Sequence, residues 1–285
     1  MNNICTQCPR ACGARPGYCG VPESFHIARA ALHHWEEPVI SGKCGSGTVF
    51  FSGCNLGCVF CQNHEISLSR KGKEVSPKRL MEIFQELADA GAHNLNLVTA
   101  SHYTAQLLPL LDDAPLPVVW NSSAYESVET LRTLEGKVAV FLPDFKFALP
   151  DVAGAYANAP DYPEAAKAAI LEMFRQTGPA KVENGLLTRG VLLRHLILPG
   201  NVENSLAVID WVADTFAPGD VLFSLMSQYT PYRTLPRPEL NRRLTKAEFI
   251  KVRNYMLKRG VTHGFWQSLS SAKEEYTPDF DFTGV

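Results

Sequence analysis

Short apolar runs alternate with helical patterns along most of this 285-residue chain. From residue 48 onward, each run has the length of a strand and is followed by apolar residues at helical spacing. Helical crossovers of this length return the chain to the same end of a sheet, so the alternation predicts a parallel α/β sheet. The predicted strands cover residues 48–53, 95–98, 117–120, 138–142, 191–198 and 221–225. A last run, 264–267, is expected to form a seventh strand or an edge.

Six strand–helix units are fewer than the eight of a closed barrel. A doubly wound sheet and an open, partial (β/α)6 TIM-like barrel therefore both fit the alternation. Ser76 and Thr245 are expected to cap the first and last helices of these units. A further helix is expected at 24–32, and the segments 151–162 and 229–244 are expected to be loops that act as local lids.

Composition and charge exclude several classes of partner. Hydrophobic residues make up 46% of the chain and charged residues 20%, as is ordinary for a globular protein. The formal net charge of −2 gives no reason to expect nucleic acid or an anionic membrane as a partner. No apolar run approaches the roughly 18 residues that span a bilayer, and the N-terminus lacks the regions of a signal peptide. We therefore expect a cytoplasmic protein.

All eight cysteines lie between positions 5 and 61, which predicts metal ligation in a reducing compartment rather than a framework of disulfides. Cys54, Cys58 and Cys61 are the most informative group, because they follow a predicted strand on a short loop that contains glycine. Three cysteines are expected to hold a cubane iron–sulfur cluster and to leave one iron open for a substrate. A zinc site completed by His64 and a set of inert buried thiols are the alternatives.

A second group of cysteines, Cys5, Cys8, Cys12 and Cys19, lies on a segment rich in proline and glycine. Four thiols within fifteen residues can close around one metal, and their spacing suits either a structural zinc or a second iron–sulfur cluster. Free reactive thiols are the alternative. Cys44 is a lone thiol, either a spare ligand for this group or a free cysteine.

The spacing Cys54-x3-Cys58-x2-Cys61, with Phe60 just before the last cysteine, resembles the signature of the radical S-adenosylmethionine (SAM) superfamily. The flanking residues resemble the branch related to pyruvate formate-lyase activating enzymes. This resemblance extends from residue 48 to about 270 and implies an open partial barrel, a [4Fe-4S] cluster and SAM bound at its open iron. It also implies that one electron splits SAM into methionine and a 5′-deoxyadenosyl radical, which abstracts hydrogen from a substrate. An anaerobic setting is expected, because open clusters are oxygen-labile.

The N-terminal pattern Cys-x2-Cys-Pro-Arg-x-Cys is similar to that of an uncharacterised sub-branch of the same relatives. Activating enzymes with extra clusters usually carry them after the first cysteine motif, so this placement departs from their pattern. We divide the chain accordingly into a Cys-rich, metal-binding extension at 1–47, which is not an independent domain, and a radical SAM partial barrel at 48–285.

Polar residues follow the predicted strands one after another, at the edge where parallel α/β folds bind ligands. Arg194 lies within a buried strand and needs a partner, which is either Asp144 or the carboxylate of SAM. The resemblance places Asp144 and Lys146 near the methionine moiety of SAM. The expected cofactor-binding residues are Phe60, Thr99, Ser101, Asn121, Ser122, Asp144, Lys146 and Arg194. Substrate contact is expected from His195, Gln228 and Tyr229, although His195 is equally suited to bonding a backbone carbonyl.

Two segments depart from the pattern of glycyl-radical activating enzymes. The stretch 98–103 stands where those enzymes have Gly-Gly-Glu-Pro, so Thr99, Ser101 or main-chain carbonyls must hold the amino group of SAM. The stretch 226–232 lacks their Pro-Tyr-His, which weakens the case for a glycyl-radical enzyme as substrate. Asn121-Ser122 also replaces their Asp-Thr, which puts a cation site there in doubt.

The expected function is hydrogen abstraction from a protein or peptide, with activation of a glycyl-radical enzyme as one form of it. A low-potential electron donor such as flavodoxin or ferredoxin is the second expected partner. Modification of a small molecule, with residues 151–190 closing over it, is an alternative with the same chemistry. A non-catalytic iron–sulfur or zinc redox sensor is the alternative from another class.

Overall fold

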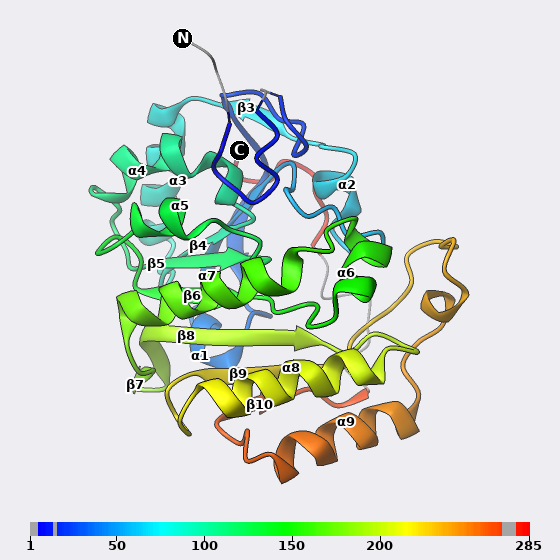
Figure 1. The fold of residues 1–285 in the computed structure, drawn as a ribbon. Coiled ribbons are helices and arrows are strands. Elements are labelled where there is room, and N and C mark those ends of the chain that lie inside the picture. Colours follow the sequence, from blue (N-terminus) through cyan, green and yellow to red (C-terminus); the bar gives the residue numbers. More distant parts are fainter. Residues whose placement is uncertain (1–4, 14–15, 270–277) are drawn as a thin grey trace.

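The computed structural model describes residues 5–13, 16–269 and 278–285, and it shows a mixed α/β fold around one open sheet (Figure 1). The order of strands across the sheet is β10-β9-β8-β6-β5-β4-β2-β1-β3, and β7 pairs with β8. The strands are β1 Phe25–His33, β2 Ser46–Phe51, β3 Lys73–Val75, β4 Leu95–Val98, β5 Val118–Ser122, β6 Val140–Pro143, β7 Lys181–Glu183, β8 Leu186–Leu196, β9 Leu222–Met226 and β10 Gly264–Trp266.

The sheet is parallel from β2 through β4, β5, β6, β8 and β9 to β10. Strands β1 and β3 extend it as antiparallel neighbours, and β7 is antiparallel to β8. This confirms the predicted parallel sheet and places the run near 264 at its edge, next to β9. An open, largely parallel sheet is what a partial barrel requires.

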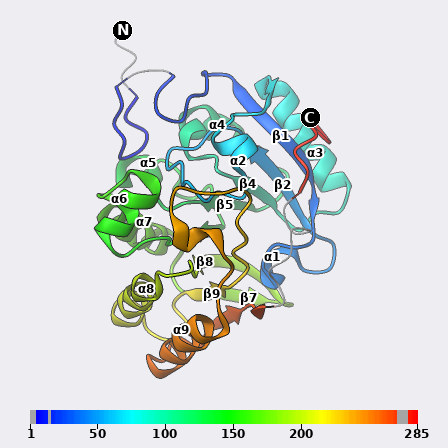
Figure 2. The same cartoon turned by 90° about the vertical axis from the view of Figure 1, so that its right-hand side faces the viewer.

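Helices α3 to α9 lie along the outer side of the sheet, as the turned view shows (Figure 2), whereas the short helices α1 and α2 pack against its inner side. The α-helices are α1 Pro38–Ser41, α2 His64–Ser67, α3 Pro77–Asp89, α4 Thr104–Leu111, α5 Val128–Arg132, α6 Pro150–Ala157, α7 Tyr162–Thr177, α8 Val202–Thr215 and α9 Lys246–Lys258. Short 3-10 turns occupy Ser101–Tyr103 and Pro238–Asn241. The two predicted caps are confirmed: Ser76 accepts from the amide of Arg79, and Thr245 forms a capping box with Glu248.

The helix expected at 24–32 is wrong, because this segment is strand β1. Its alanines suggested a helix, but tertiary pairing decides: β1 lies antiparallel to β2, with Ile27 opposite Phe51 and Ala31 opposite Thr48. As a result, the sheet begins within the segment assigned to the N-terminal extension, and residue 47 lies inside β2.

The loop expected at 151–162 is also wrong, because it contains α6 and the start of α7. Pro150 is at the first position of α6, and Asn158 ends the helix in the left-handed conformation, so both ends follow ordinary rules. The segment 229–244 is irregular except for the 3-10 turn at 238–241.

Alternation along the strands separates a large outer core from the inner face of the sheet. Trp120, Phe141 and Leu193 are buried in the outer core, beneath the helices. Their neighbours Val119 and Leu192 face inward and belong to a smaller apolar cluster. Successive residues of a strand point to opposite faces, so the inner face at the carboxyl end is the place where functional side chains can gather.

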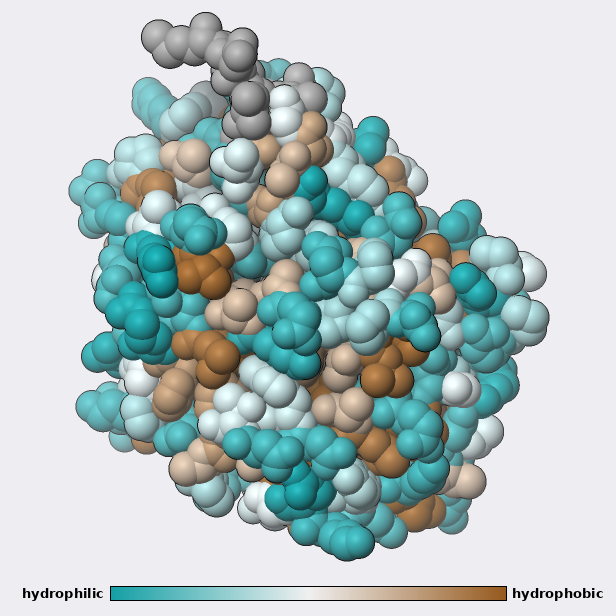
Figure 3. Space-filling view, viewed as in Figure 1, coloured by the Kyte–Doolittle hydropathy of each residue, from teal (hydrophilic) through white to brown (hydrophobic). Residues whose placement is uncertain are grey.

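No helix among the residues that the structure describes is long and apolar enough to cross a membrane. On the face seen in Figure 3, hydrophilic residues predominate and hydrophobic residues occur in small separate groups. Such scattered apolar side chains are normal on protein surfaces and do not by themselves indicate a docking site.

Candidate functional site

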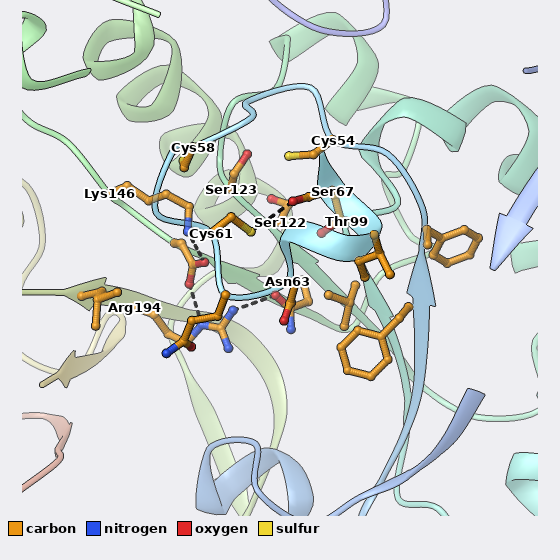
Figure 4. Close-up of a pocket in the computed structure, with 18 of the residues that line it drawn as sticks. Cys54, Cys58, Cys61, Asn63, Ser67, Thr99, Ser122, Ser123, Lys146 and Arg194 are labelled. Atoms are coloured by element: carbon orange, nitrogen blue, oxygen red, sulfur yellow. Dashed lines mark hydrogen bonds and ion pairs between the residues drawn. The ribbon is translucent and has the colours of Figure 1, made fainter. Parts of the chain in front are cut away.

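A pocket of about 240 Å³ opens at the carboxyl ends of the parallel strands. It is lined by the cysteine loop that follows β2 and by residues at the ends of β4, β5, β6 and β8. Figure 4 shows Cys54, Cys58 and Cys61 on that loop, with the side chain of Lys146 beside Cys58 and Cys61 and that of Arg194 below them. The structure therefore brings the predicted cysteine group and most of the predicted polar residues to one place.

The cysteine loop curls tightly because Gly53 and Gly57 adopt positive φ angles of 84° and 68°. The backbone amide of Leu56 donates to Cys54 Sγ (3.4 Å), and the hydroxyl of Ser67 donates to Cys61 Sγ (3.2 Å). Hydrogen bonds of this kind stabilise a ligating thiolate and tune a bound iron–sulfur cluster.

Burial dominates the protonation of the cysteines in the pocket. It raises the pKa values of the Cys58 and Cys61 thiols, although Lys146 opposes the rise at Cys58 and the Ser67 hydroxyl opposes it at Cys61. Without a metal these thiols stay protonated at neutral pH, and a bound metal ion would deprotonate them.

Arg194 is held by three partners at the wall of the pocket. Its Nε donates to Asp144 Oδ1 (2.7 Å), its Nη1 to Glu36 Oε1 (2.6 Å) and its Nη2 to Asn121 Oδ1 (2.7 Å). Burial would lower the pKa of Arg194, but the carboxylates of Asp144 and Glu36 outweigh it and keep the guanidinium charged. The expected ion pair between Arg194 and Asp144 is confirmed. The expected clamp on the carboxylate of SAM stays a prediction.

Lys146 extends the same network toward the cysteines. Its Nζ donates to Asp144 Oδ2 (2.7 Å), and both side chains are mostly buried. Burial would lower the pKa of Lys146, yet the nearby carboxylate of Asp144 outweighs burial and raises it. A buried ammonium and a guanidinium thus lie beside the three thiols, where an anionic ligand group would find charge and hydrogen-bond donors.

The other predicted cofactor-binding residues divide between the pocket and the region behind it. Phe60, Thr99, Asn121 and Ser122 line the pocket, and Thr99 adopts a strained φ of 60° there. Ser101 is buried and is not among the lining residues; its side chain hydrogen-bonds to Glu126 instead.

Of the three predicted substrate contacts, only Gln228 lines the pocket. The ring of His195 lies on the outer face of β8, with Nδ1 2.7 Å from the carbonyl of Phe145 and Nε2 2.9 Å from the hydroxyl of Ser205. Tyr229 is buried and donates to the carbonyl of Leu240 (2.7 Å). The structure does not bring His195 or Tyr229 to the pocket, and for His195 it shows the backbone bond weighed as the alternative.

Glu36 is the main site residue that sequence reasoning missed. Its second carboxylate oxygen accepts from the side-chain amides of Asn96 (3.0 Å) and Asn121 (3.1 Å), so it joins strands β4 and β5 to Arg194 on β8. Glu36 was missed because residues 24–32 were predicted to be a helix rather than a strand that ends near it. The strand-like alternation of Phe25 and Ile27 with polar neighbours was the signal that could have placed Glu36 just after a strand end.

The N-terminal cysteines lie apart from the pocket, on the far side of the cysteine loop. Cys5, Cys8 and Cys19 are half-buried, Cys12 is exposed, and none forms a disulfide within the described residues. Within the same residues, no three Cys, His, Asp or Glu side chains stand close enough to hold a single metal ion. A cubane cluster differs in that it occupies the space between its cysteines, which therefore stand farther apart.

Comparison with known proteins identifies the fold and the cysteine loop together. The model of the radical SAM superfamily matches residues 48–114, which include all three cysteines of the loop. The chain is also 32% identical over 251 residues to an uncharacterised protein of Methanocaldococcus jannaschii, covering 82% of this chain and 68% of that protein. The chain belongs to the radical SAM superfamily. Radical SAM enzymes bind a [4Fe-4S] cluster and SAM, and this family membership carries both cofactors to the chain.

The residues of this radical SAM enzyme fit both groups. Three thiols that line one pocket, with hydroxyl and amide donors directed at two of their sulfurs, suit a cluster with one open iron. The adjacent charges of Lys146, Asp144 and Arg194 suit the amino and carboxylate groups of a bound amino acid moiety.

Proposed function

We propose that this radical SAM enzyme abstracts hydrogen from a protein or peptide substrate. The observation that supports it is the size of the pocket, about 240 Å³. The cluster and SAM would occupy a pocket of this size, so a substrate would be presented at its mouth. A polypeptide can present a single residue there.

The packing of residues 151–190 supports the same choice. The small-molecule alternative needs this segment to close over the substrate. The segment contains α6, α7, β7 and the start of β8, however, and Tyr156, Tyr162 and Ile170 are buried in the core. Membership of an enzyme superfamily also argues against a non-catalytic sensor. Activation of a glycyl-radical enzyme is the narrower form of the proposal, and it rests on the likeness of the cysteine loop to that branch.

In this proposal the cluster is held by Cys54, Cys58 and Cys61. SAM is bound by the predicted cofactor-binding residues that line the pocket: Phe60, Thr99, Asn121, Ser122, Asp144, Lys146 and Arg194. When bound and reduced, the cluster would supply the electron for reductive cleavage of SAM. Lys146 would bind the carboxylate of SAM with the two ammonium protons that it does not donate to Asp144. Phe60, which packs edge-on against Phe147 and Tyr156, keeps water from the cysteine loop.

The proposal includes two further components. A low-potential one-electron donor of the flavodoxin or ferredoxin type would reduce the enzyme, in a reducing compartment at low oxygen. The cysteines of the N-terminal segment would form a second metal site, which the docking of that segment against the cysteine loop supports.

The decisive experiment follows the abstracted hydrogen. Anaerobic, reduced enzyme is incubated with SAM and either the protein fraction or the low-mass fraction of cells grown in deuterated medium. We expect deuterium in 5′-deoxyadenosine with the protein fraction, and loss of that label after the fraction has been digested with protease. Label that comes only from the low-mass fraction would contradict a polypeptide substrate, and absence of 5′-deoxyadenosine under every condition would contradict SAM cleavage itself.

A further inference from the structure

Arg10 docks the N-terminal cysteine segment onto the loop that carries Cys54, Cys58 and Cys61. Its guanidinium donates to the carbonyls of Asn55 (3.0 Å) and Leu56 (3.1 Å), both inside that loop. The same group donates to the carbonyls of Ala157 (2.8 Å) and Asn158 (2.6 Å) at the end of α6. One side chain thus satisfies four carbonyl oxygens on two elements, which fixes the segment that contains Cys8 and Cys12 against the functional site.

Direct contacts also join the two cysteine groups. Asn55, which follows Cys54, forms a side-chain hydrogen bond with the thiol of Cys8. The carbonyl of Cys19 lies 2.8 Å from the position that a Cβ on Gly53 would occupy. The N-terminal segment and the cysteine loop therefore approach each other more closely than a residue with a Cβ would allow. The segment is therefore placed by specific contacts on the back of the cysteine loop, beside α5 and α6 (Figure 2).

Within the N-terminal group, main-chain amides already point at the sulfurs. The amide of Arg10 faces the thiol of Cys8, and the amide of Val21 faces the thiol of Cys19. Cys5 and Cys12 lie close enough to both of these thiols for their charges to interact. Amide donors directed at sulfur are the surroundings that ligating thiolates need, because they offset the negative charge of the site.

The spacing of these cysteines is compatible with both zinc and an iron–sulfur cluster, and their grouping along the chain favours the cluster. Cys5-x2-Cys8-x3-Cys12 has the same two gaps as Cys54-x3-Cys58-x2-Cys61, in reverse order. Zinc sites usually draw their ligands from two separated pairs, whereas three cysteines in one short run plus a fourth are typical of iron–sulfur clusters.

We propose that Cys5, Cys8, Cys12 and Cys19 ligate a second [4Fe-4S] cluster, which Arg10 and Asn55 hold against the loop of the first. This inference rests on the N-terminal metal site included in the proposed function and names its occupant. Four protein ligands close every iron of this cluster, so it binds no substrate. Cys44 stands before the start of β2, at the other end of that strand from the Cys54 loop, and plays no part in it.

The test compares cysteine variants after anaerobic reconstitution with iron and sulfide. A triple variant Cys54→Ala, Cys58→Ala, Cys61→Ala should keep roughly half of the iron and acid-labile sulfide of the unchanged protein, because one of two cubanes remains. A quadruple variant with alanine at positions 5, 8, 12 and 19 should also keep roughly half. Cys44→Ala serves as the matched control and should lose nothing. A triple variant that holds zinc, or no metal and no sulfide, would overturn the proposal.

If the triple variant misfolds, a second measurement on a variant with a single substitution still tests the proposal. Cys12→Ala changes the exposed member of the group and should remove one of two overlapping reduced-cluster EPR signals while the other stays. An EPR spectrum and sulfide content equal to those of the unchanged protein would overturn the second cluster. SAM cleavage is a separate readout: sulfide in the triple variant with no 5′-deoxyadenosine from the unchanged protein would refute the proposed function and leave this inference standing.

Discussion

The guanidinium of Arg194 lies 2.6 Å from the carboxylate of Glu36, although 158 positions separate them in the chain. Both side chains are 12% exposed, so the pair is largely removed from water. Asp144 pairs with the opposite edge of the same guanidinium at 2.7 Å. Two carboxylates and one amide oxygen thus fix the planar group at the end of β8, in the manner to which arginine is suited.

Glu36→Gln should lower the free energy of unfolding by about 1–3 kcal/mol, because it removes one of two charged partners of a buried guanidinium. Glu37→Gln is the matched control. The carboxylate of Glu37 accepts a hydrogen bond from the Ser224 hydroxyl, and burial raises the pKa of this carboxyl group. Replacing it with an uncharged amide should therefore lower the free energy of unfolding by less than Glu36→Gln does. Denaturant unfolding of both variants measures the difference. Equal effects at 36 and 37 would show that the pair with Arg194 contributes no special stability.

Cys58→Ala should abolish formation of 5′-deoxyadenosine and the visible absorbance of the first cluster. Cys58 is buried and lines the pocket, and among the described residues no cysteine besides Cys54 and Cys61 lines it with Cys58. Cys44→Ala should leave the rate unchanged. Product is measured by chromatography after anaerobic reduction, and turnover by the Cys58 variant at the normal rate would refute its assignment as a ligand.

Ser67→Ala should make the first cluster harder to reduce. The Ser67 hydroxyl donates to Cys61 Sγ (3.2 Å), and a hydrogen bond to a ligating sulfur stabilises the more negative, reduced state. The change should shift the midpoint in an EPR-monitored redox titration to a lower potential without loss of iron. Ser69→Ala, an exposed neighbour, is the control. A midpoint that stays in place would mean that the hydroxyl does not bond the sulfur in the holoenzyme.

The parallel sheet and the cysteine loop were predictable because each depends on local patterns. Apolar runs of strand length, the caps at Ser76 and Thr245 and the cysteine spacing all act within a few residues. Strand β1 was not predictable in this way. Its alanine-rich sequence suits a helix, and only pairing with β2 makes it a strand.

In the candidate site, too, residues marked by a local pattern were predictable and residues placed by long-range contacts were not. Arg194 could be singled out as a charge in a buried strand, and alternation then sends His195 to the opposite face. Glu36 and Arg10 could not be assigned to their partners, because they bond to groups 45 to 158 positions away. In the case of Arg10 those groups are backbone carbonyls, which carry no sequence signal at all.

His195 should stay neutral down to about pH 4. Burial lowers the pKa of its ring to about 4, against a small rise from the carbonyl of Phe145. Because the pKa in the folded protein lies below that in the unfolded chain, about 6.5, the contribution to stability is full above pH 6.5. It is lost as the pH falls from there through 4. NMR titration of the histidine rings, assigned with His195→Gln, measures this; titration of that ring near pH 6.5 would contradict its burial.

Arg10→Lys should loosen the N-terminal segment while the sheet stays intact. Lysine keeps the charge but cannot donate from a planar fork to four carbonyls, nor stack over Tyr18, whose ring centre lies 3.9 Å from the guanidinium carbon. The lost contacts amount to about 1–3 kcal/mol of local stability. Hydrogen exchange should therefore quicken roughly tenfold or more at residues 5–13 and at Asn55, but not in β5 or β8. The exposed Arg243→Lys is the matched control. If exchange at residues 5–13 were already as fast in the unchanged protein as in the variant, Arg10 would not anchor the segment, and the second cluster would lose its support from docking.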